Sequence, residues 1–227
     1  MVEYGQLYDC GSFVEGVSDF LKVPSYTLSS YVACKVITPA QRDVLFDSFA
    51  NRKNVIVCGN LGVGKTTFLN TVAIELHRLG RRIVLVQNFN EFSFPESSKI
   101  LPIFTYNTPF EDYVKAIDST RSSVIINELE AGNAKPLLHA MRRGRKDIYL
   151  GLSSCSDAGH ALMRFGILAK TSFAEVADFI DLVLYLELDS ANNRIIRHFK
   201  AVSGYNEKTS EFIFHDVDSL SSVQVAS

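Results

Sequence analysis

The sequence predicts an α/β fold in which a mainly parallel sheet is flanked by helices. Short apolar runs alternate with amphipathic helical segments along most of the chain, which is the pattern of repeated strand–helix units. A glycine-rich turn joins the first apolar run to a helical segment, and near the end of the chain this alternation gives way to two strand-like runs. The chain has 227 residues, 47% of them hydrophobic and 21% charged, which suits one folded domain with small additions.

The elements follow in order from their start signals and apolar runs. Thr38 to Gln41 combines a threonine cap, a proline at the first helical position and a glutamine three residues after the cap, so a helix is predicted to about Ala50. Short apolar runs predict buried strands at residues 55–58, 83–86, 124–126, 148–152 and 182–188. Helical patterns predict helices over residues 68–79, from Thr108, over 134–144, over 161–168 and from Ser172.

Two further features concern the edges of the predicted sheet. Residues 100–106 read as a strand that contains Pro102, which lacks an N–H group, so we expect this strand near an edge. Residues 194–202 and 211–217 predict two antiparallel strands, with polar turns at 190–193 and 205–210. The sheet is therefore expected to carry a small antiparallel addition at its C-terminal end.

One motif carries chemistry, because residues 59–66 match the phosphate-loop (Walker A) pattern G-x-x-x-x-G-K-[ST] between a predicted strand and a helix. The glycines allow backbone N–H groups to surround phosphates, Lys65 should reach the β and γ phosphates, and the Thr66 hydroxyl should bind Mg²⁺. The alternative, a glycine turn with a solvated lysine, is disfavoured by this context. We expect ATP and Mg²⁺ as cofactors, and nucleotide binding by Gly59, Asn60, Leu61, Gly62, Val63, Gly64, Lys65, Thr66 and Thr67.

Hydrolysis also needs a carboxylate near the loop to organise the metal or the attacking water. Glu128 follows the strand at 124–126, whereas the preceding Asn127 is an amide and cannot act as a base. Glu91 comes just after the strand at 83–86. Both are catalytic candidates, and for each the alternative of a solvated carboxylate after a strand remains open.

Charge and composition exclude several other classes of protein. Lys and Arg number 23 against 25 Asp and Glu, and this net charge of -2 disfavours direct nucleic-acid binding through bulk charge. Arg142, Arg143, Arg145 and Lys146 cluster at the C-terminus of a predicted helix, where cations complement the helix dipole; an arginine finger or a nucleic-acid patch is the second interpretation. No apolar run approaches the ~20 residues of a membrane-spanning helix, and the start lacks a signal-peptide pattern, so we expect no integral membrane segment. The four cysteines are widely spaced and are interpreted as reduced thiols.

Six segments together carry a family likeness that runs from about Ser25 to Val217: residues 26–32, 37–41, 54–59, 64–70, 161–165 and 202–205. In these segments the sequence resembles the hexameric secretion ATPases of type IV secretion and conjugal transfer, relatives of the type II secretion and type IV pilus motors. The resemblance implies a RecA-like ATPase domain that forms a homohexameric or mixed ring. It also implies protein partners in a membrane-embedded apparatus and a cytoplasmic location, peripheral at the inner membrane.

The sequence departs from the pattern of that family at several positions of the site. Gln87 and Asn88 stand where the family has a Glu-Asp pair, Asn127 replaces a glycine, and Ser153 or Ser154 stands at a histidine position. Two hypotheses therefore stay open: an ATP-hydrolysing motor domain, or a catalytically weak or inactive nucleotide-binding structural or regulatory subunit. A small-molecule kinase is disfavoured, because no lid for an acceptor is apparent. We expect residues 1–36 to be a short N-terminal segment or linker, 37–218 the RecA-like domain, and 219–227 a flexible tail.

Overall fold

The computed structural model describes residues 25–93, 99–105, 114–117 and 121–217. Its helices are α2 (Leu28–Ala33), α3 (Pro39–Ala50), α4 (Lys65–Arg78), α6 (Ala131–Arg142), α7 (Ala158–Ala169) and α8 (Phe173–Phe179). Its strands are β1 (Val55–Gly59), β2 (Arg82–Gln87), β3 (Ile100–Phe104), β4 (Ser122–Ile126), β5 (Ile148–Ser153), β6 (Leu182–Leu188), β7 (Arg194–Asn206) and β8 (Glu211–Asp216). The predicted start of a helix at Thr108 and the predicted tail at 219–227 lie outside the described residues.

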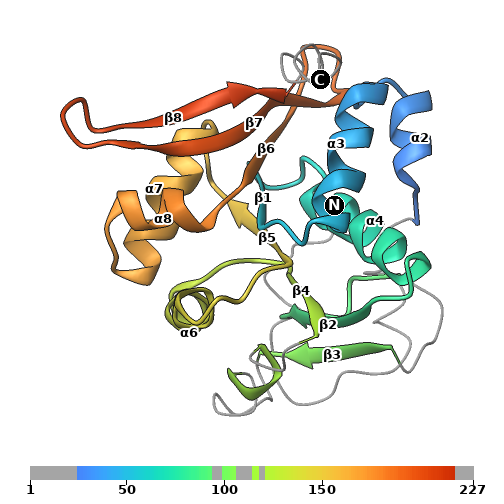
Figure 1. Ribbon diagram of the computed structural model, residues 1–227. Helices are drawn as coiled ribbons and strands as arrows, with labels where there is room; N and C mark the ends of the chain where they lie inside the picture. Colours follow the sequence, from blue (N-terminus) through green and yellow to red (C-terminus); the bar gives the residue numbers. More distant parts are fainter. Residues whose placement is uncertain (1–24, 94–98, 106–113, 118–120, 218–227) are drawn as a thin grey trace, which may run out of the picture.

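The strands form one sheet in the order β3-β2-β4-β5-β1-β6-β7-β8 (Figure 1). Neighbouring strands from β3 to β6 run parallel, whereas β6, β7 and β8 pair antiparallel. The α/β fold with an antiparallel addition is thus confirmed. Strand β3, which contains Pro102, ends the sheet on one side and confirms the prediction of an edge strand.

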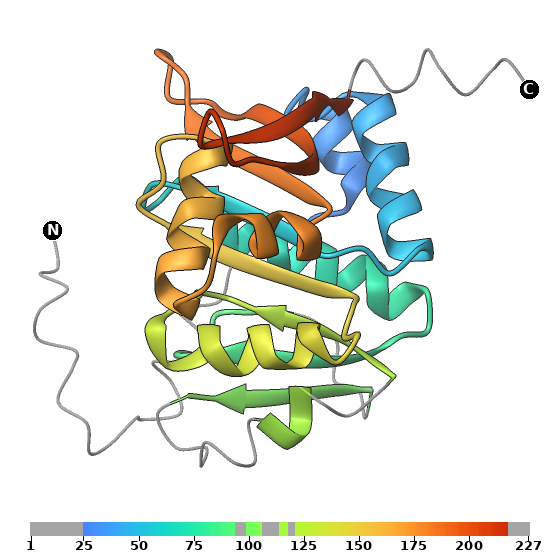
Figure 2. The ribbon, with the colours of Figure 1, turned by 60° about the vertical axis from the view of Figure 1, so that its left-hand side comes forward.

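Helices cover both faces of this sheet. Successive residues of β1 belong to different apolar clusters. Val57 lies in the cluster that contains Phe68 of α4, and Cys58 lies in the cluster that contains Phe165 of α7. Helices α2, α3 and α4 lie on one side and α6, α7 and α8 on the other (Figures 1 and 2). The central strands are therefore buried on both faces, which explains their unbroken apolar runs.

Local start signals account for the helix boundaries. The Thr38 hydroxyl accepts a hydrogen bond from the Gln41 amide at 3.1 Å, and the Gln41 side chain accepts one from the Thr38 amide at 2.9 Å. Helix α3 therefore begins where the capping box predicted, and it ends at Ala50 as expected. The Asp157 and Ser172 side chains cap α7 and α8 by accepting a hydrogen bond from the amides of His160 and Glu175.

Helix α2 is a feature that we did not predict from the sequence. Thr27 and Ser30 form its capping box, Leu28 is fully buried, and the Leu28 amide donates to the Glu75 side chain of α4 at 3.1 Å. At six residues the helix is too short to show a helical period, and its stability comes from packing against α3 and α4.

Strand β7 is longer than predicted. A turn was expected from Tyr205, but β7 continues to Asn206 and Tyr205 pairs with Phe212 of β8, with ring centroids 5.0 Å apart. The ladder has a bulge between Val202 and Gly204, where Gly204 has a positive φ of 151°. Aromatic pairing across the two strands extends the ladder through a segment whose composition suggested a turn.

The carboxyl ends of the parallel strands place several polar residues at one edge of the sheet. The loop after β1, the segment after β2, the residues after β4 and the end of β5 all leave the sheet on this edge. Crevices beside such strand ends are the usual ligand sites of open α/β sheets. No helix within the described residues is long and apolar enough to cross a membrane.

Candidate functional site

The loop between β1 and α4 requires glycine at three positions. Gly59, Gly62 and Gly64 have positive φ values of 146°, 81° and 101°, and Gly64 is the residue that caps α4. A Cβ atom on Gly59 would lie 2.2 Å from the Leu186 carbonyl oxygen of β6. The loop can therefore lie close against β6 only because residue 59 has no side chain.

Lys65 is buried beneath this loop. It is 6% exposed, and its Nζ donates to the Asn60 carbonyl oxygen at 2.8 Å. Burial lowers the pKa of Lys65, and the nearby carboxylate of Glu128 acts in the opposite direction. The lysine and the N-terminus of α4 together concentrate positive charge at the loop, which suits a phosphate group.

A chain of hydrogen bonds joins the loop to two of the neighbouring strand ends. The Thr66 hydroxyl donates to the Glu91 side chain, and the Asn127 Nδ2 donates to Glu91 Oε2 at 2.6 Å. Burial raises the pKa of Glu91, although both hydrogen bonds act to lower it. Glu91 thus lies directly beside the predicted magnesium ligand.

Ser153, at the end of β5, holds Glu128. The Ser153 amide donates to Glu128 Oε1 and the Ser153 hydroxyl donates to Glu128 Oε2, both at 2.7 Å. Residue 153 pairs with Gly59 across the sheet, so this clamp lies next to the start of the loop. Of the two serines considered at the histidine position, Ser153 is therefore the one that touches the acid, and Ser154 is exposed.

The side chains present at this edge fit a magnesium ion. The Thr66 hydroxyl, the Glu91 carboxylate and the Asn127 Oδ1 are hard oxygen donors, which Mg²⁺ prefers. Asn127 Oδ1 is a buried acceptor without a hydrogen-bond partner among the described residues. The described residues contain no group of three or more His, Cys, Asp or Glu able to hold a metal.

The structure brings the predicted loop residues together with both predicted acids. Glu128 interacts electrostatically with Lys65 and with Glu91, which places these three charges in one site. Sequence reasoning missed the linking role of Asn127 and the donor role of Ser153. Gln87 is 1% exposed, and neither of its polar side-chain atoms has a hydrogen-bond partner within the described part of the chain.

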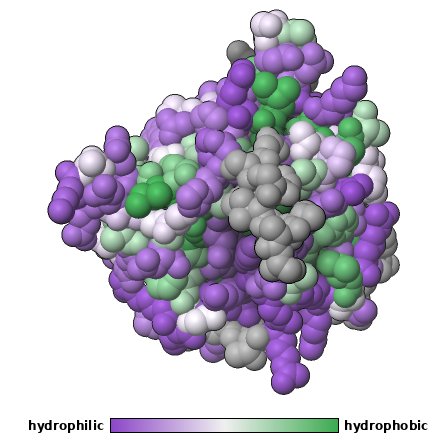
Figure 3. All heavy atoms as spheres, turned by 45° about the horizontal axis from the view of Figure 1, so that its top comes forward, coloured by the Kyte–Doolittle hydropathy of each residue, from purple (hydrophilic) through white to green (hydrophobic). Residues whose placement is uncertain are grey.

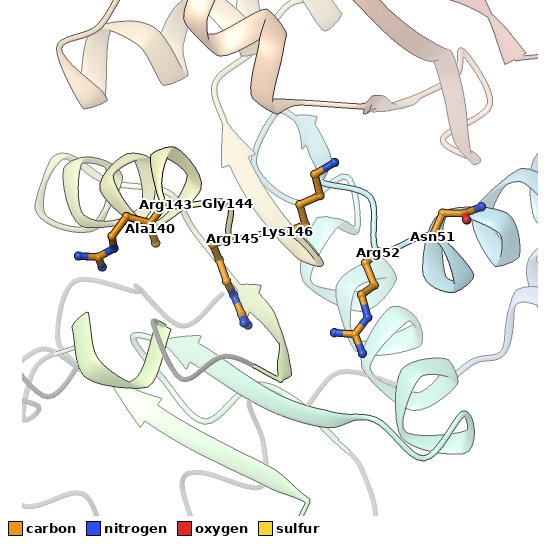
Figure 4. A pocket seen from close by; sticks show the side chains of 7 residues that line it. All are labelled: Asn51, Arg52, Ala140, Arg143, Gly144, Arg145 and Lys146. Atoms are coloured by element: carbon orange, nitrogen blue, oxygen red, sulfur yellow. The ribbon is translucent and has the colours of Figure 1, made fainter.

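The basic residues after α6 lie at the opposite edge of the sheet, before the amino end of β5. A cavity of about 570 Å³ there is lined by Asn51, Arg52, Ala140, Arg143, Gly144, Arg145 and Lys146. Figure 4 shows that the side chains of Arg143, Arg145 and Lys146 point in different directions. Arg142 forms an ion pair with Glu175 of α8 at 2.7 Å. This arrangement favours the interpretation as cations at a helix C-terminus over a single convergent anion site.

Comparisons with known proteins agree with this architecture. No protein-family model matches the chain. It is 25% identical over 189 residues to the conjugal transfer protein TrbB of Rhizobium radiobacter, covering 78% of this chain and 57% of TrbB. It is 26% identical over 158 residues to the type IV secretion system protein PtlH of Bordetella pertussis, covering 60% of this chain and 45% of PtlH. The chain thus spans about half the length of these curated relatives.

Two solved structures share the fold. One is the VirB11 ATPase from the Brucella suis type IV secretion system in complex with sulphate, with a TM-score of 0.57, 15% identity, and coverage of 79% of this chain and 64% of VirB11. The other is the pilus retraction motor PilT with bound ADP, with a TM-score of 0.52, 14% identity, and coverage of 82% and 55%. Together the comparisons show that the chain is similar in sequence to a conjugal transfer protein and a type IV secretion protein, and that it shares the fold of VirB11 and PilT.

Proposed function

We propose that the chain binds ATP with Mg²⁺ at residues 59–67 and hydrolyses it as a motor domain of a bacterial type IV secretion or conjugal-transfer apparatus. The observation that carries this proposal is the glycine-dependent loop with buried Lys65 at the N-terminus of α4. Two solved structures with this fold support it: VirB11 was solved with sulphate, an anion similar in shape to phosphate, and PilT was solved with ADP.

Each side chain then has a defined task. Lys65 exchanges its contact with the Asn60 carbonyl for the β and γ phosphates. The Thr66 hydroxyl donates its hydrogen bond to Glu91, and its oxygen would hold Mg²⁺, which would neutralise phosphate charge. Glu128, oriented by Ser153, positions the water that attacks the γ phosphate.

The test is a nucleotide-binding and phosphate-release assay of the purified chain beside a Lys65→Ala variant. We expect the chain to bind a fluorescent ATP analogue and to release phosphate above the level of the variant, in a magnesium-dependent way. Absence of nucleotide binding by the unaltered chain would refute the proposal.

A second candidate is a nucleotide-binding structural or regulatory subunit that turns over slowly or not at all. It is favoured by Asn127, an amide that adds no negative charge beside Glu91, and by the engagement of both Glu128 oxygens by Ser153. Binding without phosphate release above the Lys65→Ala level, even with candidate partner proteins, would select this candidate over the motor.

We further propose that the domain assembles into a homohexameric or mixed ring on the cytoplasmic side of the inner membrane, with protein subunits of the apparatus as partners. The names of TrbB and PtlH, a conjugal transfer and a type IV secretion protein, support this proposal. Native mass spectrometry with MgATP should show a six-subunit species, alone or with a partner subunit. Only monomers under every nucleotide and partner condition would contradict the ring.

A further inference from the structure

Arg194, the first residue of β7, lies against the phosphate loop. A Cβ atom built on Gly64 would be 3.0 Å from both Cδ and Nε of Arg194. The sheet register explains this approach: Gly59 pairs with Leu186 of β6, and Leu188, two residues further on, pairs with Arg194. The beginning of β7 is therefore fixed beside the entry to α4.

The turn that precedes Arg194 is well ordered by hydrogen bonds. The Asp189 carboxylate accepts bonds from the Ala191 and Asn193 amides, both at 2.8 Å, and from the Asn193 side chain at 3.1 Å. These bonds lower the pKa of Asp189, so the turn remains charged and hydrogen-bonded at neutral pH. The backbone position of Arg194 is thus set before any ligand arrives.

Arg194 differs from two other cations of β7 in its ion pairing within the described residues. Further along β7, Arg197 pairs with Glu187 and Lys200 pairs with Asp216, whereas no carboxylate pairs with the exposed Arg194 within the described residues. Arg194 lies instead against Gly64, the residue at the N-cap of α4, where a cation is unfavourable by itself. An anion bound between Arg194 and the N-terminus of α4 would offset the repulsion between these two positive groups.

Tyr31 of α2 lies within electrostatic range of Arg194. Burial raises the pKa of Tyr31 to about 12, and the nearby Arg194 acts in the opposite direction. The Tyr31 ring packs edge-on against Phe68 in the first turn of α4, with centroids 5.2 Å apart. Arg194 therefore lies against the N-terminus of α4 and within electrostatic range of Tyr31 of α2.

We propose that Arg194 binds the α and β phosphates of the bound nucleotide from within the same chain. The planar guanidinium offers a fork of donors that suits phosphate oxygens, and Gly64 immediately precedes the helical N–H groups that surround this part of a nucleotide. The inference rests on the proposed function and adds to it a phosphate ligand from the C-terminal hairpin. Because ADP and ATP share these phosphates, Arg194 contributes equally to the binding of both.

The test compares Arg194→Ala with Arg194→Lys, with Arg197→Ala as a control from the same strand and with Lys65→Ala. Affinities for fluorescent ADP and ATP analogues are measured by titration, and thermal unfolding without nucleotide verifies that each variant folds. We expect Arg194→Ala to lower the affinity for both nucleotides by roughly 10- to 100-fold, the range of one charge-assisted hydrogen bond. Arg194→Lys should restore part of this loss, and Arg197→Ala should bind like the unaltered chain.

The outcomes separate this inference from the function on which it rests. If the unaltered chain binds neither nucleotide, the proposed function fails. If it binds both and Lys65→Ala does not, but Arg194→Ala binds within about twofold of the unaltered chain, only the role of Arg194 is overturned. Loss of ATP affinity with unchanged ADP affinity would also overturn it, because the contact would then be to the γ phosphate.

Discussion

At the scale of single residues, the glycines of the phosphate loop are not equivalent. Gly59 combines a φ of 146° with a Leu186 carbonyl that would lie 2.2 Å from an added Cβ, and backbone cannot move aside as a side chain can. Gly62 has a φ of 81°, but nothing lies within 4 Å of its added Cβ. The first position is restricted by contact and conformation, and the second by conformation alone.

We therefore predict that Gly59→Ala lowers the free energy of unfolding by more than about 3 kcal/mol, whereas Gly62→Ala lowers it by about 1 kcal/mol. Urea unfolding of the two variants beside the unaltered chain measures both values. Equal losses would show that β6 does not lie against Gly59 as described.

Glu91 makes the site sensitive to pH. Burial raises its pKa, and only the ionised carboxylate adds negative charge near Mg²⁺. We predict that magnesium-dependent nucleotide affinity falls as the pH is lowered through this raised pKa, and that Glu91→Gln removes this part of the pH dependence. The affinity for a fluorescent ATP analogue is measured by titration between pH 5 and 8, with magnesium or with a chelator. If the magnesium-dependent affinity changed with pH equally in the unaltered chain and in Glu91→Gln, Glu91 would not lie near the metal.

The sequence predicted the residues of the loop because the motif is contiguous. Glu91 and Glu128 were also predicted as candidates, since each follows a predicted strand. Ser153 as the partner of Glu128, and Arg194 as the neighbour of Gly64, depend on register between strands that are far apart in the chain. Local patterns contain no information about such register, so these contacts required the structure.

At the scale of elements, buried Asp147 ties the amino ends of several strands together. It is 1% exposed and accepts hydrogen bonds from Arg81 before β2 at 3.0 Å, Ser123 of β4 at 2.8 Å and Tyr149 of β5 at 3.1 Å. Asp147 also adopts a positive φ of 71°. A buried carboxylate of this kind is stable only with all of its donors present.

We predict that Asp147→Ala lowers the free energy of unfolding by about 3–5 kcal/mol, because it leaves the partly buried guanidinium of Arg81 without its carboxylate. Asp43→Ala is the matched control, since Asp43 is 65% exposed and, among the described residues, pairs only with the adjacent Arg42; its effect should stay within about 0.5 kcal/mol. Chemical unfolding at neutral pH compares the two. Similar small effects would mean that the Asp147 cluster contributes little to stability.

Element boundaries were predicted well where one local signal decides them. The capping box of α3 and the alternation from β1 to β6 are local, and the structure confirms both. Helix α2 and the extension of β7 depend on packing: Leu28 is buried by neighbouring helices, and Tyr205 is held by Phe212 and by Phe173 of α8. Tertiary contacts therefore override weak local preferences at both ends of the domain.

At the scale of the whole molecule, nucleotide binding should raise the free energy of unfolding. A ligand that binds only the folded state stabilises it by about 2.7 kcal/mol at 100 times its dissociation constant. We predict a stabilisation of this size with MgATP, and none for Lys65→Ala at the same concentration. Thermal or urea unfolding with and without nucleotide measures it, and equal shifts in the two proteins would place the nucleotide away from the loop.

The face of the molecule seen in Figure 3 is mostly hydrophilic, with separate hydrophobic patches. The alternation of strands and helices predicted a parallel sheet, but the position of β1 between β5 and β6 could not be derived. Handedness rules restrict crossovers without fixing the order of strands, and that order is what places β6 beside the loop.

The length of β7 has a mechanical consequence. At 13 residues, the strand extends over a distance on the order of 40 Å, from Arg194 at the phosphate loop to the turn after Asn206. The hairpin that it forms with β8 projects from the body of the molecule in Figure 1 and contacts α8 through Tyr205. Because β7 spans this length, a small tilt where Arg194 meets the loop would become a larger displacement at the turn after Asn206.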